Sequence, residues 1–292
     1  MKITNKTNLP KPIEDMAKSE YSYTPKRYSV TSLLKPTRQL LLTRRHNNDI
    51  EQDCADMIWM LFGQAVHKVL EEKGEGAELC KEEKLTVALE NGYTISGILD
   101  LYNLDTGEVT DYKTASIWKV MFKDYSDWKK QGMMYAWLLR KNGFPCNKAV
   151  FYAILKDWSK AEAKRKHDYP QQSVVRVEFD VNDESLAEID RFINEKMDEV
   201  IANENAPDDQ LPMCSEEDRW NSGNTYAVMK KGRKTAMRVL NSKEKALEWR
   251  EENGGDYIEE RKGEDKRCKD YCACCEFCSY WQETYKTEDK GE

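Results

Sequence analysis

The sequence predicts an α/β core, then a small α+β subdomain and a cysteine-rich end. Short stretches with the alternating pattern of β-strands are interspersed with longer stretches that have the spacing of amphipathic helices. Asn91-Gly92 between the first two strands is a strong hairpin signal. The predicted strands of the core are 84–90, 93–103, 108–116, 148–158 and 173–181, and its predicted helices are 49–72, 127–142 and 183–205.

The composition is that of a folded globular chain. It has 292 residues, of which 39% are hydrophobic and 34% are charged, which excludes a disordered chain and suffices for a sizeable core. No apolar run approaches the roughly 20 residues that span a bilayer, and the start of the chain lacks the apolar centre of a secretory signal. We therefore expect a cytoplasmic protein without a membrane partner.

The net charge of −7 argues at first against a nucleic-acid partner, because domains that bind nucleic acids are often basic. A nuclease site, however, collects carboxylates, and DNA needs only a local strip of cations. Lys129 with Lys130, residues 164–166 and residues 230–234 are basic clusters that can supply this strip. Each cluster alone is also what an ordinary solvated surface contains.

Breaks in the pattern divide the chain into four parts. Residues 1–27 are polar with scattered prolines and predict a flexible arm, whereas 28–205 hold the core. A linker opens the small α+β subdomain at 206–263, and 264–292 carry the cysteine cluster and a charged tail. The subdomain is predicted to contain strands at 225–232, 235–240 and 256–261 and a helix at 242–253.

Two aspartates flank the second turn of the predicted sheet. If 105–106 is the centre of that turn, antiparallel pairing places Asp100 directly opposite Asp111, with roughly 5 Å between opposed side chains. Lys113 follows two residues later and points to the same face. Opposed carboxylates repel unless a cation joins them, and oxygen ligands suit Mg²⁺ or Mn²⁺. A bulge at Gly107 would shift this register by one residue.

These residue types suit the hydrolysis of a phosphodiester. A divalent ion held by Asp100 and Asp111 polarises a phosphate and lowers the pKa of a bound water. Lys113 holds that water or stabilises the charge that develops on the phosphate oxygens. Asp-X-Lys also occurs by chance, and the plain alternative is an ordinary pair of edge strands.

Further residues follow in a characteristic order. His67 lies in GQAVHKVLE on the predicted helix before the hairpin, and Gln131 and Tyr135 lie four residues apart on one face of the helix after it. The order His, Asp, Asp-X-Lys, Gln-X-X-X-Tyr resembles the RecB-like branch of the PD-(D/E)XK nuclease superfamily, particularly phage exonucleases. The resemblance covers residues 28–205 and the cysteine-bearing end.

The resemblance implies a PD-(D/E)XK restriction-endonuclease-like core, a mixed central sheet flanked by helices, that cleaves DNA ends with Mg²⁺ or Mn²⁺. It also implies a role in phage or mobile-element recombination or replication, with DNA as partner and a phage recombination or annealing protein as a second partner. The implied metal ligands are His67, Asp100 and Asp111, and the implied catalytic set is Asp100, Asp111, Lys113, Gln131 and Tyr135.

Five of the nine cysteines fall between positions 268 and 278. A disulfide framework is not expected in a cytosolic chain of this length, whereas dense thiolates bind soft metals. The segment resembles the ends of CRISPR-associated four-cysteine nucleases and AddB-type helicase-nucleases, whose cysteines hold a [4Fe–4S] cluster. Zn²⁺ and free thiols are the alternatives.

The resemblance favours Cys268, Cys272 and Cys278 as three of the ligands. In those relatives the fourth cysteine precedes the active-site His, but the matching stretch of this chain has none. Cys214 is the preferred fourth ligand and Cys54, which also suits a plain core position, is the alternative. The remaining cysteines are Cys80, Cys146, Cys274 and Cys275, of which Cys275 also has a ligand-like spacing to Cys272.

Three functions fit these features. The first is a DNA exonuclease, for which the aromatic residues Trp118, Phe122, Tyr125 and Trp128 are candidates to stack on bases of a frayed strand, although such aromatics more often pack in a core. The second is an endonuclease of defence or repair, which preference for internal sites would distinguish. The third is a metal-stapled DNA-binding protein without turnover, against which the intact His–Asp–Asp–Lys set argues. The sequence leaves polarity and oligomeric state open.

Overall fold

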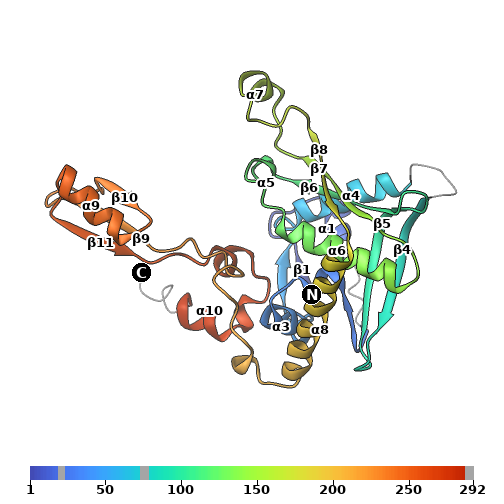
Figure 1. The fold of residues 1–292 in the computed structure, drawn as a ribbon. Coiled ribbons are helices and arrows are strands. Elements are labelled where there is room, and N and C mark those ends of the chain that lie inside the picture. Colours follow the sequence, from blue (N-terminus) through green and yellow to red (C-terminus); the bar gives the residue numbers. More distant parts are fainter. Residues whose placement is uncertain (19–23, 73–78, 287–292) are drawn as a thin grey trace. The chain divides into compact units, whose positions relative to one another are not determined.

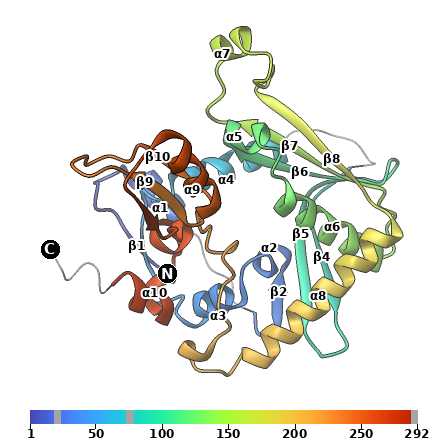
Figure 2. The ribbon, with the colours of Figure 1, turned by 60° about the vertical axis from the view of Figure 1, so that its left-hand side comes forward.

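The computed structural model describes residues 1–18, 24–72 and 79–286, and the chain forms two compact units (Figures 1 and 2). Unit 1 comprises Met1–Leu40 and Asn47–Asn205, and unit 2 comprises Leu41–His46 and Ala206–Glu292. Arg45 and His46 tie the short segment into unit 2, since each places a side-chain nitrogen 2.6 Å from a carboxylate oxygen of Asp208. Among the described helices, none combines the length and apolar character needed to cross a bilayer.

Within the described residues, six strands of unit 1 form a mixed sheet in the order β2-β5-β6-β7-β8, with β4 also paired to β5. β2 runs parallel to β5 and β6 parallel to β7, whereas the remaining pairs are antiparallel. Helices flank this sheet, which confirms the predicted α/β class with a mixed central sheet. The strands are β2 (Arg27–Ser29), β4 (Leu79–Ala88), β5 (Thr94–Asn103), β6 (Glu108–Ala115), β7 (Lys148–Leu155) and β8 (Val174–Asp180).

The hairpin that joins β4 to β5 is the one that Asn91-Gly92 predicts. Gly92 has a φ of +80°, a conformation that glycine adopts without steric cost. The Leu89 N–H donates to the Tyr93 carbonyl at 2.7 Å and closes the turn. A local turn signal therefore fixes the register of the longest strand pair in the sheet.

Helices α6 (Ser126–Lys141) and α8 (Asp183–Asn203) pack against each other along unit 1 (Figure 2). Trp137 Nε1 donates to Asp190 Oδ1 across this contact at 2.7 Å. Asn182 begins α8 by accepting the Ser185 N–H in a capping box. The buried side of α8 follows helical spacing and consists of Ile189, Ile193, Met197 and Val200.

Close packing brings α6 onto the sheet. A Cβ at Gly132 would lie 2.8 Å from the Ala149 Cβ, and one at Gly97 in β5 would lie 2.6 Å from Leu138 Cδ1. Both distances are shorter than van der Waals contact, so only glycine permits this approach. The helix thereby reaches the strands β5, β6 and β7 with its buried face.

Replacing Gly132 with alanine is expected to destabilise unit 1 although alanine favours helix. The gain in helix propensity is about 1 kcal/mol, whereas overpacking of a core costs about 1–3 kcal/mol, and the obstructing Ala149 Cβ cannot rotate away. Urea unfolding of wild type and Gly132→Ala measures the difference. Gly143→Ala is the control, because a Cβ at Gly143 would meet no atom within 4 Å and only its positive φ opposes the change. A Gly132→Ala protein more stable than wild type would contradict this account of the packing.

The amino-terminal segment differs from the flexible arm that its composition predicts. Residues 2–4 form β1 (Lys2–Thr4), which pairs in parallel with β3 (Glu51–Asp53), and α1 spans Lys11–Ala17. The physical reason is apolar burial, because Ile3, Leu9 and Ile13 pack against a buried cluster. That cluster consists of Ala17, Cys54, Met57 and Leu61. Residues 19–23 of the predicted arm lie outside the described residues.

The predicted helix 49–72 is shorter than expected. It begins at Ile58 and forms α4 (Ile58–Glu71), because the preceding residues form β3 and a turn. Asp53 holds that turn by accepting the N–H groups of Lys6 at 2.7 Å and Ala55 at 3.1 Å. Cys54, the alternative fourth ligand, is fully buried in the apolar cluster of unit 1.

In unit 2, three of the described strands form an antiparallel sheet in the order β10-β9-β11. They are β9 (Thr225–Met229), β10 (Arg238–Leu240) and β11 (Tyr257–Arg261), and α9 (Lys243–Asn253) packs against β9 and β10. The cysteine-bearing segment after β11 consists of short turns followed by α10 (Ser279–Thr284). Residues 287–292 of the charged tail lie outside the described residues.

Candidate functional site

The β5–β6 hairpin has the predicted register. Leu101 pairs with Thr110 and Asn103 with Glu108, so the next residues along the two strands are the two aspartates. Gly107 does not shift the register. It lies within the turn with a φ of +65° and donates its N–H to the Asn103 carbonyl at 2.9 Å.

The strands part at the two aspartates, which the predicted direct opposition did not anticipate. The described pairing ends at Leu101–Thr110. Beyond it the Tyr112 N–H donates to Asp100 Oδ2 at 2.8 Å instead of to a strand carbonyl. Asp100 therefore caps the free edge of β6 with its side chain.

Asp111 and Lys113 share a face of β6 and form a close ion pair. Lys113 Nζ lies 2.6 Å from Asp111 Oδ2, and the Asp111 side chain is 6% exposed. The Gln131 amide of α6 donates to Asp111 Oδ1 at 3.3 Å and to the Tyr135 hydroxyl at 3.1 Å. No further hydrogen bond reaches Asp111 Oδ2 from the described residues.

His67 approaches from α4. Its Nδ1 lies 3.2 Å from Asp100 Oδ2, and its ring meets that of Tyr112 edge-on at 6.4 Å. One turn earlier, a Cβ at Gly63 would lie 3.2 Å from Thr114 Oγ1, so α4 lies close to β6. Because Tyr112 and Thr114 alternate with Asp111 along the strand, α4 and α6 contact opposite faces of β6.

The structure thus brings all the predicted active-site residues of unit 1 together. One pair is His67 with Asp100, the other is Lys113 with Asp111, and the Tyr112 main chain joins them. Gln131 and Tyr135 extend the second pair into α6.

The electrostatics of the site favour a bound cation. Burial raises the pKa of Asp111 to about 6; the Lys113 ammonium opposes this rise and the Asp100 charge adds to it. The hydrogen bond to Asp100 is the main cause that raises the pKa of His67. The buried Asp111 carboxyl, the half-buried Asp100 carboxyl and a neighbouring imidazole are a donor set that suits Mg²⁺ or Mn²⁺.

Asp100 and Asp111 make their contacts with other residues of the site. His67 and the Tyr112 N–H contact Asp100 Oδ2, and Lys113 contacts Asp111 Oδ2. Over the described ranges, no three His, Cys, Asp or Glu side chains already stand in the arrangement of a metal shell. The residues fit a divalent ion by chemistry and burial, and among the described residues the Lys113 ammonium is the polar group that contacts the buried Asp111 Oδ2.

The raised pKa of Asp111 predicts a pH-dependent stability in metal-free protein. A carboxyl whose pKa rises from 3.8 to about 6 on folding stabilises the fold below pH 3.8, and this contribution is lost as pH rises through about 6. Relative to Asp111→Asn, the free energy of unfolding of wild type should fall by about 3 kcal/mol over that window. Urea unfolding in EDTA measures it. A constant difference between the two proteins from about pH 4 to about pH 7 would contradict the raised pKa.

The four candidate stacking aromatics divide into two kinds. Trp118 in α5 (Ile117–Met121) and Phe122 just after it are 56% and 74% exposed, and their rings stack at 5.6 Å. Trp128 is buried and stacks on Phe151, while Tyr125 stacks on Trp128. Trp128 therefore packs in the core and Tyr125 is half-buried against it, whereas Trp118 and Phe122 are exposed to a ligand.

Sequence reasoning missed the residues that position these groups. Asp157, after β7, accepts the Ser116 hydroxyl and the Ile117 N–H, both at 2.7 Å, and so fixes the start of α5. Tyr112 contributes its main-chain N–H and its ring. Tyr112 occupies the variable position of Asp-X-Lys, where the motif specifies no residue type.

In unit 2 the predicted cysteine ligands influence one another electrostatically. Burial raises the pKa of Cys268 to about 12, and the charges of Cys272, Cys214 and Cys278, together with that of Asp265, add to the effect. Cys274, which the sequence reasoning left without a role, is 1% exposed and its sulfur lies 3.6 Å from that of Cys272. Cys274 is therefore a further candidate ligand beside Cys272.

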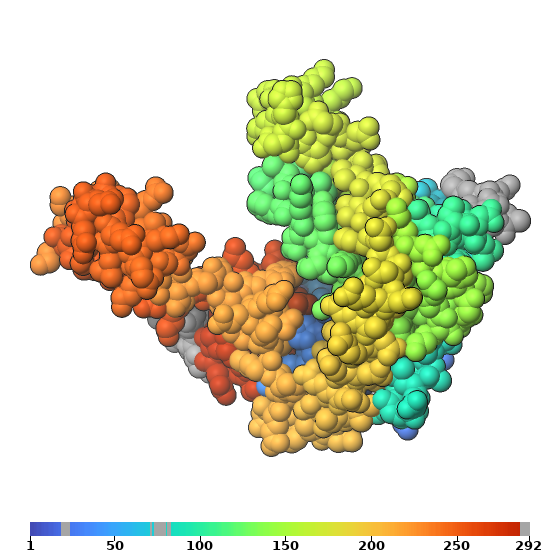
Figure 3. Space-filling view, viewed as in Figure 1, coloured from blue at the N-terminus to red at the C-terminus, as the bar shows by residue number. Residues whose placement is uncertain are grey.

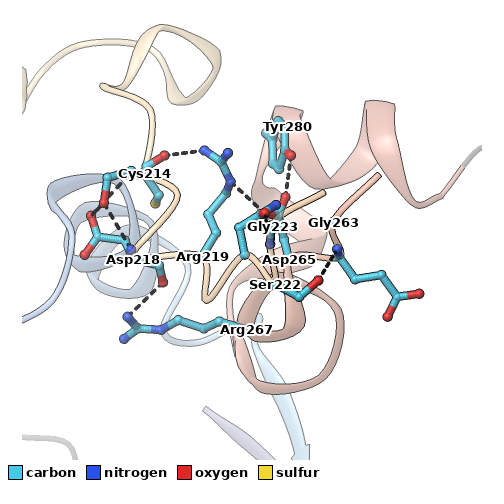
Figure 4. A network of polar contacts seen from close by, with 12 residues as sticks. Cys214, Asp218, Arg219, Ser222, Gly223, Gly263, Asp265, Arg267 and Tyr280 are labelled. Atoms are coloured by element: carbon cyan, nitrogen blue, oxygen red, sulfur yellow. Dashed lines mark hydrogen bonds and ion pairs between the residues drawn. The ribbon is translucent and has the colours of Figure 1, made fainter. Parts of the chain in front are cut away.

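A polar network connects the Cys214 loop to the cysteine-bearing segment (Figure 4). Arg219 donates to the Cys214 carbonyl at 2.5 Å, and its Nε lies 3.2 Å from Asp265 Oδ1. Asp265 is 2% exposed and also accepts hydrogen bonds from Asn221 and Tyr280. Burial opposes its ionisation, but these hydrogen bonds hold the pKa of Asp265 below its ordinary value.

Comparison with solved structures found folds of limited similarity. The chain resembles SSO0001 with a TM-score of 0.46 and 17% identity, covering 68% of this chain and 85% of that one. It resembles an alkaline exonuclease, LHK-Exo, from Laribacter hongkongensis with a TM-score of 0.40 and 12% identity, covering 61% and 89%. It resembles a phage-related exonuclease from Haemophilus somnus 129PT with a TM-score of 0.37 and 16% identity, covering 57% and 81%.

No protein-family model matches the sequence, and a search of curated proteins found no significant match. At these TM-scores the structural likeness carries no argument about the chemistry of this chain.

Proposed function

We propose that the protein is a metal-dependent DNA nuclease, and an exonuclease rather than an endonuclease. The observation that carries the proposal is the convergence of His67, Asp100, Asp111 and Lys113 at the point where β5 and β6 part. Two acids, an imidazole and an ammonium group, arranged as two contacting pairs, are the residue types that phosphodiester hydrolysis needs. A role in phage or mobile-element recombination, with an annealing protein as partner, belongs to the same proposal and rests on the sequence resemblance.

His67, Asp100 and Asp111 would hold Mg²⁺ or Mn²⁺, which supplies an activated water and polarises the phosphate. Lys113 neutralises charge on the phosphate oxygens from its position 2.6 Å from Asp111. Gln131 holds Asp111 by donating to Oδ1, and Tyr135 orients the Gln131 amide.

Digestion of linear and covalently closed circular DNA with Mg²⁺ or Mn²⁺ tests the proposal. An exonuclease degrades the linear duplex to nucleotides and leaves the closed circle intact. Cleavage of the circle supports the endonuclease alternative on the same core. Binding of DNA with no cleavage of either substrate supports the third alternative, a DNA-binding protein without turnover.

Removing the exposed aromatic pair is expected to weaken the binding of single-stranded ends. Stacking of one base on an aromatic ring contributes about 1–3 kcal/mol, so Trp118→Ala with Phe122→Ala should weaken binding by roughly tenfold or more. Anisotropy of a labelled single strand in EDTA measures this. Phe144→Ala is the matched control, since Phe144 is 37% exposed and precedes β7 at the opposite end of the sheet. If the wild type bound an abasic strand as tightly as a strand with bases, base stacking would be ruled out.

We also propose that Cys214, Cys268, Cys272 and Cys278 hold a soft metal centre, a [4Fe–4S] cluster with Zn²⁺ as the alternative. Support comes from the influence of the other three thiols on the pKa of Cys268 and from the network that ties Cys214 to Asp265. Thiolates and soft metals are matched ligands. The centre would be structural, because it would join two segments of unit 2 that lie about fifty residues apart in sequence.

A further inference from the structure

Unit 2 contains a strongly basic segment within an acidic chain. From Thr225 to Lys243 the sequence has six lysines and arginines and no aspartate or glutamate, whereas the whole chain carries a net charge of −7. This segment forms β9, the turn 230–237 and β10 (orange in Figures 1 and 3). Its cations are Lys230, Lys231, Arg233, Lys234, Arg238 and Lys243.

The four cations of the turn, at 230–234, are all exposed. In the part of the chain that the structure describes, no ion pair joins any of them to a carboxylate. The basic cluster at 164–166 differs, because Arg165 and Lys166 both pair with Glu162. That cluster lies in the segment with α7 (Lys160–Arg165), which stands away from the sheet of unit 1 (Figure 3).

The turn that carries these charges is fixed by its own hydrogen bonds. Asp256 Oδ2 accepts the Lys231 N–H at 2.6 Å, and the Arg233 N–H donates to the Lys230 carbonyl at 3.0 Å. Gly232 provides the positive φ of +85°. Asp256 therefore binds the main chain of the turn, and no ion pair with the described cations of the turn is formed. Like charges held this close repel one another, and a polyanion that binds them removes that repulsion.

We propose that the β9–β10 hairpin binds the phosphate backbone of duplex DNA. The identity of the polyanion rests on the proposed nuclease function. Lysine and arginine contacts to phosphates give affinity without sequence specificity. The hairpin supplies a DNA contact from unit 2, separate from the acidic site of unit 1.

The salt dependence of binding tests the hairpin. Each phosphate contact contributes a slope of about −0.9 to log K against log salt concentration for duplex DNA. The variant Lys231→Gln, Arg233→Gln, Lys234→Gln removes two lysines and one arginine. The control Lys164→Gln, Arg165→Gln, Lys166→Gln removes the same charges from the ion-paired cluster. Anisotropy of a labelled blunt duplex is measured in EDTA at several KCl concentrations, with thermal unfolding as a check of folding.

We expect the hairpin variant to bind more weakly and its slope to become shallower by about 2 to 3, while the control changes it by less than about 1. Equal changes in both variants would show a non-specific effect of net charge and overturn the proposal, as would an unchanged slope in the hairpin variant. A loss confined to single-stranded DNA would also overturn it. Because EDTA prevents cleavage, these results do not depend on the active site, and a protein that binds through the hairpin but never cleaves would refute the nuclease proposal alone.

Discussion

Replacing Lys113 with methionine is expected to reduce DNA cleavage by at least about a hundredfold, since removal of one preorganised group that stabilises developing charge costs about 10²–10³ in rate. Methionine keeps an unbranched apolar stem near the Phe151 ring, over which Lys113 Nζ lies at 5.8 Å. The change therefore removes the charge with little loss of packing. Cleavage of a linear duplex under saturating Mn²⁺ measures the effect.

Lys113 also acts on Asp111, so two roles must be separated. The Lys113 charge opposes the burial that raises the pKa of Asp111 to about 6, and its loss would favour the protonated carboxyl, which binds a metal poorly. Assay at high pH with saturating Mn²⁺ restores the carboxylate but not the ammonium group. If Lys113 stabilises the phosphate charge, Lys113→Met stays inactive there; full recovery would make Lys113 only a positioning residue.

Lys148 is a control that shows whether the loss of any lysine charge near the sheet reduces DNA cleavage. Lys148 begins β7 next to β6, its side chain is 32% exposed, and it pairs with Glu178 at 3.1 Å. Lys148→Met should retain the wild-type rate, because surface ion pairs contribute little and Lys148 contacts none of the proposed active-site residues. A comparable loss in both variants would argue against a special role for Lys113.

The register of the β5–β6 hairpin was predictable because its signals are local. A turn centred at 105–106 sets the pairing, and the two-residue period of a strand places Asp111 and Lys113 on one face. The contact between His67 and Asp100 was not predictable in the same way. It depends on α4 lying close to β6, which Gly63 allows beside Thr114. No local pattern states which helix face meets which strand.

The amino-terminal segment is a second case in which a tertiary contact could not be predicted from local sequence. Its composition predicts an arm, yet Ile3, Leu9 and Ile13 lie against a buried cluster that includes Cys54 and Leu61. Three apolar residues spread over eleven positions have neither helical nor strand spacing, so only the tertiary fold reveals their common partner. Likewise, the distance between the Cys272 and Cys274 sulfurs depends on the short turns of the cysteine-bearing segment, which spacing rules for ligands do not describe.

Replacing Cys268 with serine is expected to abolish metal content and to destabilise unit 2. A structural metal site contributes on the order of 10 kcal/mol to folding, and for a domain of this size each 1 kcal/mol shifts the melting temperature by about 4–8 °C. Even a partial loss of that contribution should lower the melting temperature of unit 2 by more than about 10 °C. Metal analysis and the visible absorption of anaerobically purified protein distinguish iron–sulfur from Zn²⁺.

The choice between Cys272 and Cys274 gives the sharpest form of this test. Serine at Cys272 should abolish the metal, whereas serine at Cys274 should leave it, if Cys214, Cys268, Cys272 and Cys278 are the ligands. The reverse pattern would assign the position to Cys274, whose sulfur lies 3.6 Å away from that of Cys272. Cys146→Ser is the control, because Cys146 is buried in unit 1 and its pKa is raised to about 11 mainly by burial. A wild-type protein that contains no metal and has the same melting temperature as Cys268→Ser would contradict the metal centre. Unit 2 would then fold with free thiols.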